Sequence, residues 1–207
     1  EVNYRWVNDK VTISTNLYLR MTEDKIEQLM VEDSNTGKLH LTYHNDASDR
    51  SIGLEATGNL SLQTWWSMNV STSVYHHLIS GLVAGEELKK SRIGGSVQMV
   101  SSFNYAKSSL QLINYFQSRT QALQYDVSSF HFMDIAFNQK LLDGKLSVGI
   151  RVADVLGSRN INLITVAQNT HLDGKFTNES PVFMLNVSCQ LNQYQKKTRD
   201  VQTEFDM

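Results

Sequence analysis

The sequence has little cysteine, little proline and no long apolar segment. Its 207 residues include one cysteine, Cys189, so no intrachain disulfide bond can form. One proline and eleven glycines fit long, uninterrupted strands better than a turn-rich β-sandwich. Polar residues interrupt every apolar run, so no segment reaches the length of a transmembrane helix.

Charged residues are also few. They make up 19% of the chain, the net charge is −2, and no dense basic block is present that could form a nucleic-acid-binding surface. We therefore expect no nucleic-acid partner. The content of Tyr, Phe, Val, Ile and Leu argues against disorder outside the loops and the tail.

What the sequence does contain is a repeated alternation of apolar and polar residues. Val11, Ile13 and Leu17 fall on one face of an expected strand, whereas Ser14 and Asn16 fall on the other. The pattern predicts about nine strands, many of them longer than the roughly five or six residues usual in a globular sheet. They are expected over residues 2–6, 11–32, 39–62, 66–74, 97–105, 110–117, 133–138, 146–152 and 183–192. In the segment Leu110–Gln117 the faces stay unassigned, because apolar residues occupy both.

The predicted connections alternate in length. Short turns are expected near residues 8–10, 63–65, 107–109 and 142–145. Within the last of these, Asp143-Gly144 is a strong hairpin signal, because both residues accept a positive φ. Longer polar connections are expected near residues 33–38, 80–91, 118–128 and 157–180. Short turns at one end and long loops at the other are typical of outer-membrane barrels.

A sheet that spans hydrocarbon must close, because lipid offers no hydrogen-bond partner to an unpaired strand edge. Each strand then turns apolar residues to the lipid, while its other face can be polar if it lines water or a plug. Here the polar face carries Asn16, Arg20, Glu55, Asn69, Arg151 and Asn186. A soluble β-sandwich would have to bury one of the two faces. The pattern therefore predicts an all-β, antiparallel transmembrane β-barrel in an outer membrane.

Four aromatic residues are expected at the membrane–water interface. Tyr4 and Trp6 precede the first predicted turn, and Trp65 and Trp66 directly follow another short turn. Such rings are favoured at the interface because they combine an apolar body with a polar tip. The alternative is that they are core aromatics of a soluble sheet.

Five segments carry a resemblance to a known family. They are Asp49–Ala56, Gln63–Val70, Met133–Phe137, Leu141–Val148 and Val152–Leu156. In their order and spacing, the sequence resembles the C-terminal barrel strands of TonB-dependent receptor-like outer-membrane proteins, in particular the outer membrane protein beta-barrel family. The likeness covers most of residues 1–193. The chain departs from the family pattern at Leu156-Gly157, where Phe-Asn is usual, and continues past the last strand.

The resemblance implies a barrel of about 22 strands in the bacterial outer membrane, enclosing an N-terminal plug and driven from the inner membrane through TonB. Nine strands would be only part of such a barrel. We therefore expect residues 1–193 to be its C-terminal strands, with the plug and the TonB-interacting segment upstream of Glu1. Residues 194–207 are expected to form a charged C-terminal tail.

The sequence contains no recognisable catalytic constellation, so we expect no enzymatic activity and no catalytic residue, metal or cofactor. The adjacent His76 and His77 point to opposite faces of a strand and cannot easily bind one metal ion. Asp46, Asp49 and Asp143 read as turn residues. Ligand contacts are expected in the outer loops. The candidates are Glu86, Glu87, Lys89, Lys90, Arg159 and Asn160.

These inferences give one leading function hypothesis and two alternatives. The leading hypothesis is TonB-dependent uptake of a nutrient, such as an iron chelate, a glycan or a peptide, by a barrel whose partners are lipid, the TonB complex and the nutrient. The first alternative is a structural or secretion-associated barrel that transports no nutrient. The second is a soluble β-sandwich that serves as a binding module.

Overall fold

The computed structural model describes residues 1–33, 36–83, 85–167 and 170–190. Within these ranges the chain is built almost entirely from antiparallel β-strands, and no helix is long and apolar enough to span a membrane. The elements are β1 (Val2–Val7), β2 (Val11–Glu32), β3 (Leu39–Gln63), β4 (Trp66–Val83), β5 (Glu86–Tyr105), β6 (Ser108–Gln117), β7 (Thr120–Gln121), β8 (Tyr125–Val127), β9 (Phe130–Leu141), the 3-10 turn η1 (Leu142–Gly144), β10 (Leu146–Ala153), β11 (Asn160–Ala167), β12 (Thr170–Thr177) and β13 (Val182–Cys189).

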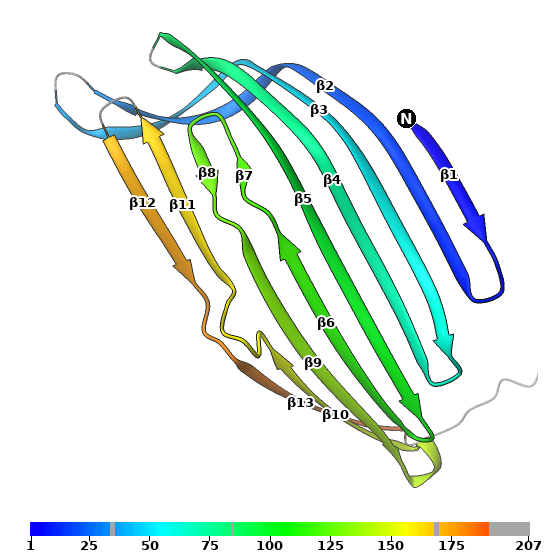
Figure 1. Cartoon of the computed structure of the whole chain (residues 1–207). Coiled ribbons are helices and arrows are strands. Elements are labelled where there is room, and N and C mark those ends of the chain that lie inside the picture. Colours follow the sequence, from blue (N-terminus) through cyan, green and yellow to red (C-terminus); the bar gives the residue numbers. More distant parts are fainter. Residues whose placement is uncertain (34–35, 84, 168–169, 191–207) are drawn as a thin grey trace, which may run out of the picture.

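Nine of these strands form one sheet in the order β1-β2-β3-β4-β5-β6-β9-β10-β13 (Figure 1). The short turns expected from the sequence lie together at one end of this sheet. At the last of them Asp143 and Gly144 adopt φ values of 52° and 88°, which confirms the hairpin predicted there. Strands β1 and β13 form the two edges and do not pair with each other, so the sheet is open.

The two faces of the sheet differ in chemistry, as the alternation predicted. The register aligns Leu17 with Leu54 and Leu54 with Val74 in one row. A second row consists of Trp66, Phe103, Leu110, Phe137, Ile150 and Leu185. We call this face outward. The opposite, inward face is polar and carries Asn16, Glu55 and Ser73 in one row.

The register also assigns β6, whose faces the sequence left open. Leu110 pairs with Phe137 and Leu112 with Ile135, in rows that continue to Val152 and Ile150 of β10. Leu110, Leu112 and Phe116 are therefore outward, whereas Ile113 and Tyr115 are inward.

The outward apolar run has the height of a membrane core. On β4 it extends from Trp66 to Val74, roughly 26 Å of strand at about 3.3 Å per residue. At a tilt of about 40° this crosses roughly 20 Å, close to the apolar band of about 25 Å in outer-membrane barrels. Beyond this run the outward residues are mixed, since His76, Ser91 and Lys89 are polar whereas Leu78 and Ile93 are apolar. The upper parts of β2 to β5 extend beyond this apolar run.

Three expected loops instead contain strands. Residues 80–91 are the ends of β4 and β5 around a short turn, residues 118–128 contain β7 and β8, and residues 157–180 contain the β11–β12 hairpin. The last two segments form a second, four-stranded sheet in the order β12-β11-β8-β7. These hairpins have no clear apolar alternation of their own, which is why the sequence pattern did not reveal them.

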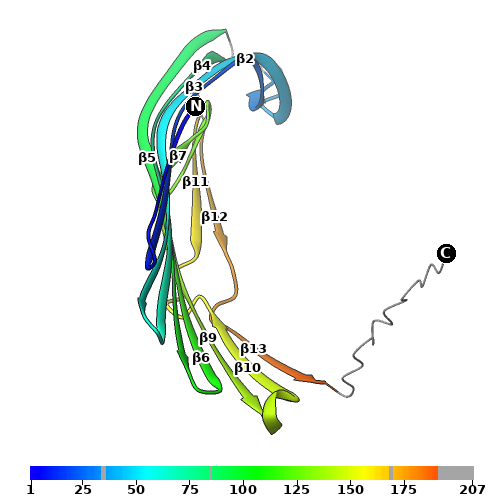
Figure 2. The same cartoon turned by 90° about the vertical axis from the view of Figure 1, so that its right-hand side faces the viewer.

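The upper part of the β2–β3 hairpin bends toward the inward side of the sheet (Figure 2). The register shifts between Thr22 and Lys25 and again between Lys25 and Glu27, and Asp24 adopts a φ of 51°. Such bulges bend a strand. The extra residue also moves the side chains that follow it to the opposite face of the sheet. As a result Leu29 is turned inward and buried.

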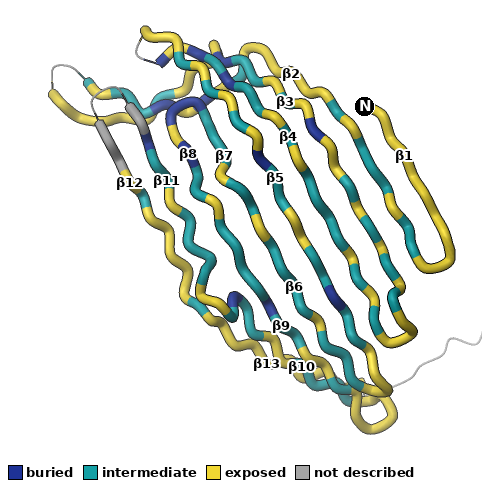
Figure 3. The backbone as a smooth tube through the Cα atoms, viewed as in Figure 1, coloured by how far each residue is buried: buried dark blue, intermediate teal, exposed yellow. Residues whose placement is uncertain are grey.

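The most buried residues gather where this bent hairpin meets β7 and β8 (Figure 3). Their cluster consists of Leu29, Ala47, Ile79, Val83 and Leu123. Most of the remaining apolar side chains are exposed, among them Leu54, Val74 and Phe183. The apolar outward face is therefore exposed, and the described buried cluster forms where the hairpins fold inward.

We predict that arginine at two neighbouring positions of β4 has opposite consequences. Val70→Arg places a charge in the middle of the outward apolar run and should destabilise the folded protein by about 2–4 kcal/mol. Ser71→Arg turns the same charge to the polar inward face and should be tolerated. Heat-dependent gel mobility of the full-length protein extracted from outer membranes measures both. Equal tolerance of the two variants would contradict the assignment of the faces.

Candidate functional site

The segment between β6 and β9 folds over the inward face of β4 and β5. It contains β7 and β8, and we call residues 118–128 the inner hairpin. Its tip residue Leu123 is 0% exposed. A Cβ atom at Gly81 of β4 would lie 2.9 Å from Leu123 Cδ2, so only glycine lets the tip approach the wall this closely. The inner hairpin is thus packed against the wall.

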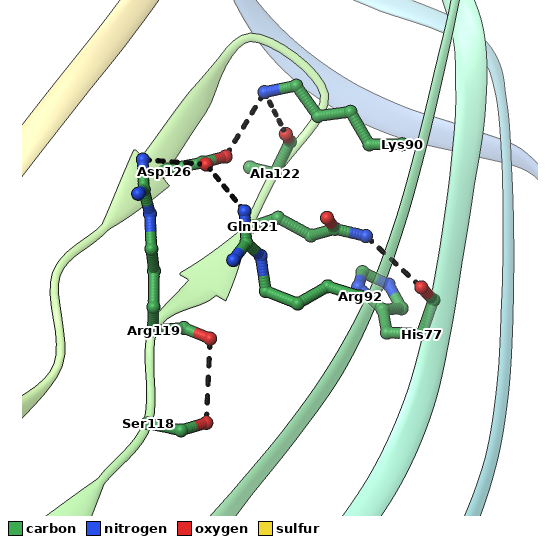
Figure 4. A network of polar contacts seen from close by, with 8 residues as sticks. All are labelled: His77, Lys90, Arg92, Ser118, Arg119, Gln121, Ala122 and Asp126. Carbon is green, nitrogen blue, oxygen red and sulfur yellow. Dashed lines mark hydrogen bonds and ion pairs between the residues drawn. The ribbon is translucent and has the colours of Figure 1, made fainter.

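One carboxylate of the inner hairpin contacts three basic side chains (Figure 4). Asp126 Oδ1 accepts a hydrogen bond from Lys90 Nζ at 3.2 Å, and Oδ2 lies 3.1 Å from Arg92 Nη2 and 3.0 Å from Arg119 Nη2. The Asp126 side chain is only 13% exposed. Arg92 and Lys90 lie two residues apart in β5, so both point inward and reach it together. The three cations exceed the single negative charge of Asp126.

A second charged group lies nearby on β2, β3 and β4. Lys25 Nζ contacts Glu27 at 2.7 Å and Asp49 at 2.8 Å, and His77 Nε2 lies 3.0 Å from Asp49. Burial raises the pKa of Asp49, but hydrogen bonds from Lys25 and His77 outweigh burial and leave the pKa below its ordinary value. Burial lowers the pKa of Lys25, but Asp49 and Glu27 raise it overall. Both groups are therefore held in their charged forms.

Side-chain amides connect the inner hairpin to strands far away in the sequence. Gln124 accepts a hydrogen bond from the Met30 backbone N–H at 2.6 Å and donates one to the Met30 carbonyl at 2.7 Å. Gln121 donates to the His77 carbonyl at 3.1 Å, and Lys90 donates to the Ala122 carbonyl at 3.2 Å (Figure 4). The hairpin is thus fixed to the wall and to the bent end of β2.

Below the inner hairpin the inward face forms an open cavity of about 440 Å³. Tyr18 and Tyr75 lie on one side of it, and Lys25, Asp49 and His77 lie near its upper end. The lining also includes Arg20, Thr22 and Ser51, together with Thr120 and Gln121 of the inner hairpin. This cavity, which includes the charged group of Lys25, Asp49 and His77, and the charged group around Asp126 form the candidate functional site.

The six residues predicted to contact ligand are not brought together. Glu86, Glu87, Lys89 and Lys90 lie in β5 rather than in a loop. Glu87 and Lys89 are outward, paired with Leu82 and Ser80, whereas Lys90 is inward and contacts Asp126. The pairing of β4 with β5 continues to Val83 and Glu86, so the loop predicted for residues 80–91 is wrong. A role for these residues in ligand contact stays a prediction.

Arg159 and Asn160 lie at the start of the β11–β12 hairpin, which was also expected to be a loop. The Arg159 guanidinium carbon lies 3.7 Å from the centroid of the Phe132 ring, and Asn160 Nδ2 donates to the Gly157 carbonyl at 3.4 Å. Both side chains thus have local structural partners.

The predicted interface aromatics lie at the short-turn end of the sheet. Trp65, Trp66 and Phe103 form a stack with ring centroids 5.8 to 6.2 Å apart. Trp6 pairs with Ile13 and Tyr4 with Thr15, in the outward rows. This position is the one expected at a membrane interface, and the interface role itself stays a prediction.

The prediction for the two adjacent histidines is confirmed, whereas the prediction for the three aspartates is confirmed only at Asp143. His76 and His77 do point to opposite faces, since His76 bonds to Ser91 and His77 to Asp49. Asp46 and Asp49, however, lie inside β3, and only Asp143 is in a turn. Within the described residues no group of three or more His, Cys, Asp and Glu side chains is arranged to hold a metal ion.

Sequence reasoning missed Asp126, Arg92 and Arg119. The alternate spacing of Lys90 and Arg92 could have indicated an inward basic pair on β5, since period two is the strand repeat. Nothing in the local sequence of Asp126 indicates that it lies against them, because the contact spans 34 residues.

We predict that Asp126→Asn loosens the inner hairpin, because three basic side chains then face one another without a carboxylate. All four side chains are partly solvated, so a cost of about 1–3 kcal/mol is expected, a roughly 10- to 100-fold faster amide hydrogen exchange over residues 118–128. Asp143→Asn is the control, since Asp143 is 94% exposed and pairs only with Lys107 at the opposite end. Unchanged exchange in Asp126→Asn would contradict the role of this contact.

Comparison with known proteins gives one result. The model of the outer membrane protein beta-barrel family matches residues 1–188. Comparisons with curated proteins and with solved structures give no match. The matched range includes all nine strands of the open sheet except the last residue of β13. The chain therefore belongs to the outer membrane protein beta-barrel family and is located in the bacterial outer membrane.

Proposed function

We propose that this chain is part of the wall of a TonB-dependent receptor-like transporter that takes up a nutrient. Residues 1–193 would supply the C-terminal strands of a larger barrel of about 22 strands. The nutrient would be an iron chelate, a glycan or a peptide, captured from outside and released when TonB displaces a plug.

The open sheet supports a larger barrel. An unpaired edge in hydrocarbon costs several kcal/mol for each exposed peptide group, so β1 and β13 need partners. Further strands between these edges would satisfy them and close the wall.

The inward face supports a wide lumen rather than a filled one. A small barrel packs its interior with side chains from all sides. Here the inward face of β4 carries small polar residues over the height of the apolar run, namely Asn69, Ser71 and Ser73. Such a surface suits contact with water or with a polar plug.

The position of the inner hairpin and its charged contacts are the observation that supports the proposal most strongly. The hairpin reaches into the lumen at the end of the sheet opposite the short turns, which is the extracellular end in outer-membrane barrels. Around its tip, four basic side chains from the hairpin and from β2 and β5 contact three carboxylates, those of Glu27, Asp49 and Asp126. A charged constriction above a polar cavity suits selection of a solute that enters from outside.

A structural or secretion-associated barrel is the remaining alternative within this family. It would need no lumen cavity under the inner hairpin and no TonB partner. The charged contacts would then serve only to hold the hairpin, and the plug would be dispensable.

Transport is tested in the host by deleting the full-length gene and growing cells with iron chelates, glycans or peptides as the limiting nutrient. We expect one nutrient class to be lost, with the same defect after disruption of tonB. Complementation with the full-length Asp143→Asn gene should restore growth, whereas Asp126→Asn should restore it only in part. Normal growth on every nutrient, without capture of the TonB C-terminal domain, would support the structural alternative.

A further inference from the structure

We propose that the cavity below the inner hairpin binds a saccharide, with the rings of Tyr18 and Tyr75 as a stacking platform. This inference rests on the proposed transport function and assigns the ligand class of the same site. Its basis is a row of alternating tyrosine and glycine residues across four strands.

The register places Tyr18 of β2 beside Gly53 of β3, Gly53 beside Tyr75 of β4, and Tyr75 beside Gly94 of β5. A Cβ atom at Gly53 would lie 2.6 to 2.8 Å from three atoms of the Tyr18 phenol, Oη, Cζ and Cε1. A Cβ atom at Gly94 would lie 3.0 Å from three atoms of the Tyr75 phenol. Because several phenol atoms are equally near, each ring lies over its neighbouring glycine.

Rings that lie over the backbone turn their other face away from it. The Arg20 guanidinium carbon lies 5.6 Å from the centroid of the Tyr18 ring, so Arg20 borders this face of Tyr18. Tyr18 and Tyr75 are both partly exposed, and both line the cavity of about 440 Å³. This volume falls within the roughly 300–1,000 Å³ of typical small-molecule sites. Each ring thus offers a flat apolar surface inside an otherwise polar wall.

Polar side chains border the platform on both sides. The adjacent row toward the outer end contains Arg20, Ser51 and His77. The row on the other side contains Glu55 and Ser73, together with Asn16. These groups supply both hydrogen-bond donors and acceptors in the two inward rows next to the rings. Thr120 and Gln121 add further polar groups from the inner hairpin.

A saccharide matches this combination better than a simple anion or an apolar molecule. A sugar ring has a face of C–H groups, whose partial positive charge suits the negative face of an aromatic ring, and a rim of hydroxyls that both donate and accept. Of the two cations that line the cavity, Lys25 contacts Asp49 and Glu27, whereas Arg20 lies over the Tyr18 ring and is available to donate to a ligand hydroxyl. An apolar ligand would leave the polar rows without hydrogen bonds.

The test is isothermal titration calorimetry of the full-length protein in detergent with maltohexaose, xylohexaose, mannohexaose and chitohexaose. We expect at least one of these probes to bind. Tyr18→Ala and Tyr75→Ala should each weaken that binding roughly tenfold, whereas Tyr18→Phe should keep most of it. Tyr43→Ala is the matched control, because Tyr43 lies in the bent part of β3 and is 70% exposed.

A pair of glycine variants tests the platform without removing a ring. Gly53→Ala should displace the Tyr18 ring and weaken binding, whereas Gly58→Ala on the same strand meets only Leu60 Cδ1 at 3.5 Å and should leave it unchanged. Heat-dependent gel mobility checks folding in each case. If an alanine variant does not fold, Tyr18→Leu and Tyr75→Leu, which keep apolar volume over the glycines, carry the same expectation.

Three results would overturn the inference. They are no binding of any of the four oligosaccharides, unchanged binding in both tyrosine variants, and binding of citrate or inorganic phosphate that is lost in Arg20→Ala, which would indicate an anion site. The assay contains no TonB, so failure of saccharide binding and failure of TonB-dependent growth are separate outcomes.

Discussion

A peptide group placed in hydrocarbon finds no water to bond with, and the architecture of this chain follows from that constraint. Every backbone donor and acceptor must pair within a sheet, so the strands are long and the sheet has two chemically distinct faces. The outward rows are apolar and exposed, as at Leu54 and Val74. The usual arrangement of a globular protein, an apolar interior under a polar surface, is thereby reversed over the membrane-spanning part of the wall.

Beyond the membrane the constraint is relaxed, and the same strands behave differently. Above the apolar run, bulges near Asp24 bend β2 and β3, and the inner hairpin closes against them around Leu123. Water is available there, so charged groups such as Asp126 and Lys25 can be held in networks with several partners. One chain thus combines a spanning wall without a core and an outer region with a small core and a charged lumen surface.

The sequence predicted the features that depend on strict alternation. The nine strands of the main sheet, the Asp143-Gly144 turn and the opposite orientation of His76 and His77 could all be derived from a repeat of two. The bulges could not, since one extra residue exchanges the faces of all that follows, and Leu29 became inward for this reason. The inner hairpin was also missed, because Asp126 and Gln124 gain their partners from strands that are distant in sequence.

The contact between Gln124 and Met30 has a consequence for assembly. The two residues are 94 positions apart in sequence, with β3, β4, β5 and β6 between them. Contacts of such high sequence separation form late, because the intervening chain must first be ordered. The inner hairpin can therefore dock only on strands that have already paired in the right register. Docking of the inner hairpin therefore requires a correctly paired sheet. Intermediates with a wrong strand register would not form the charged lumen surface.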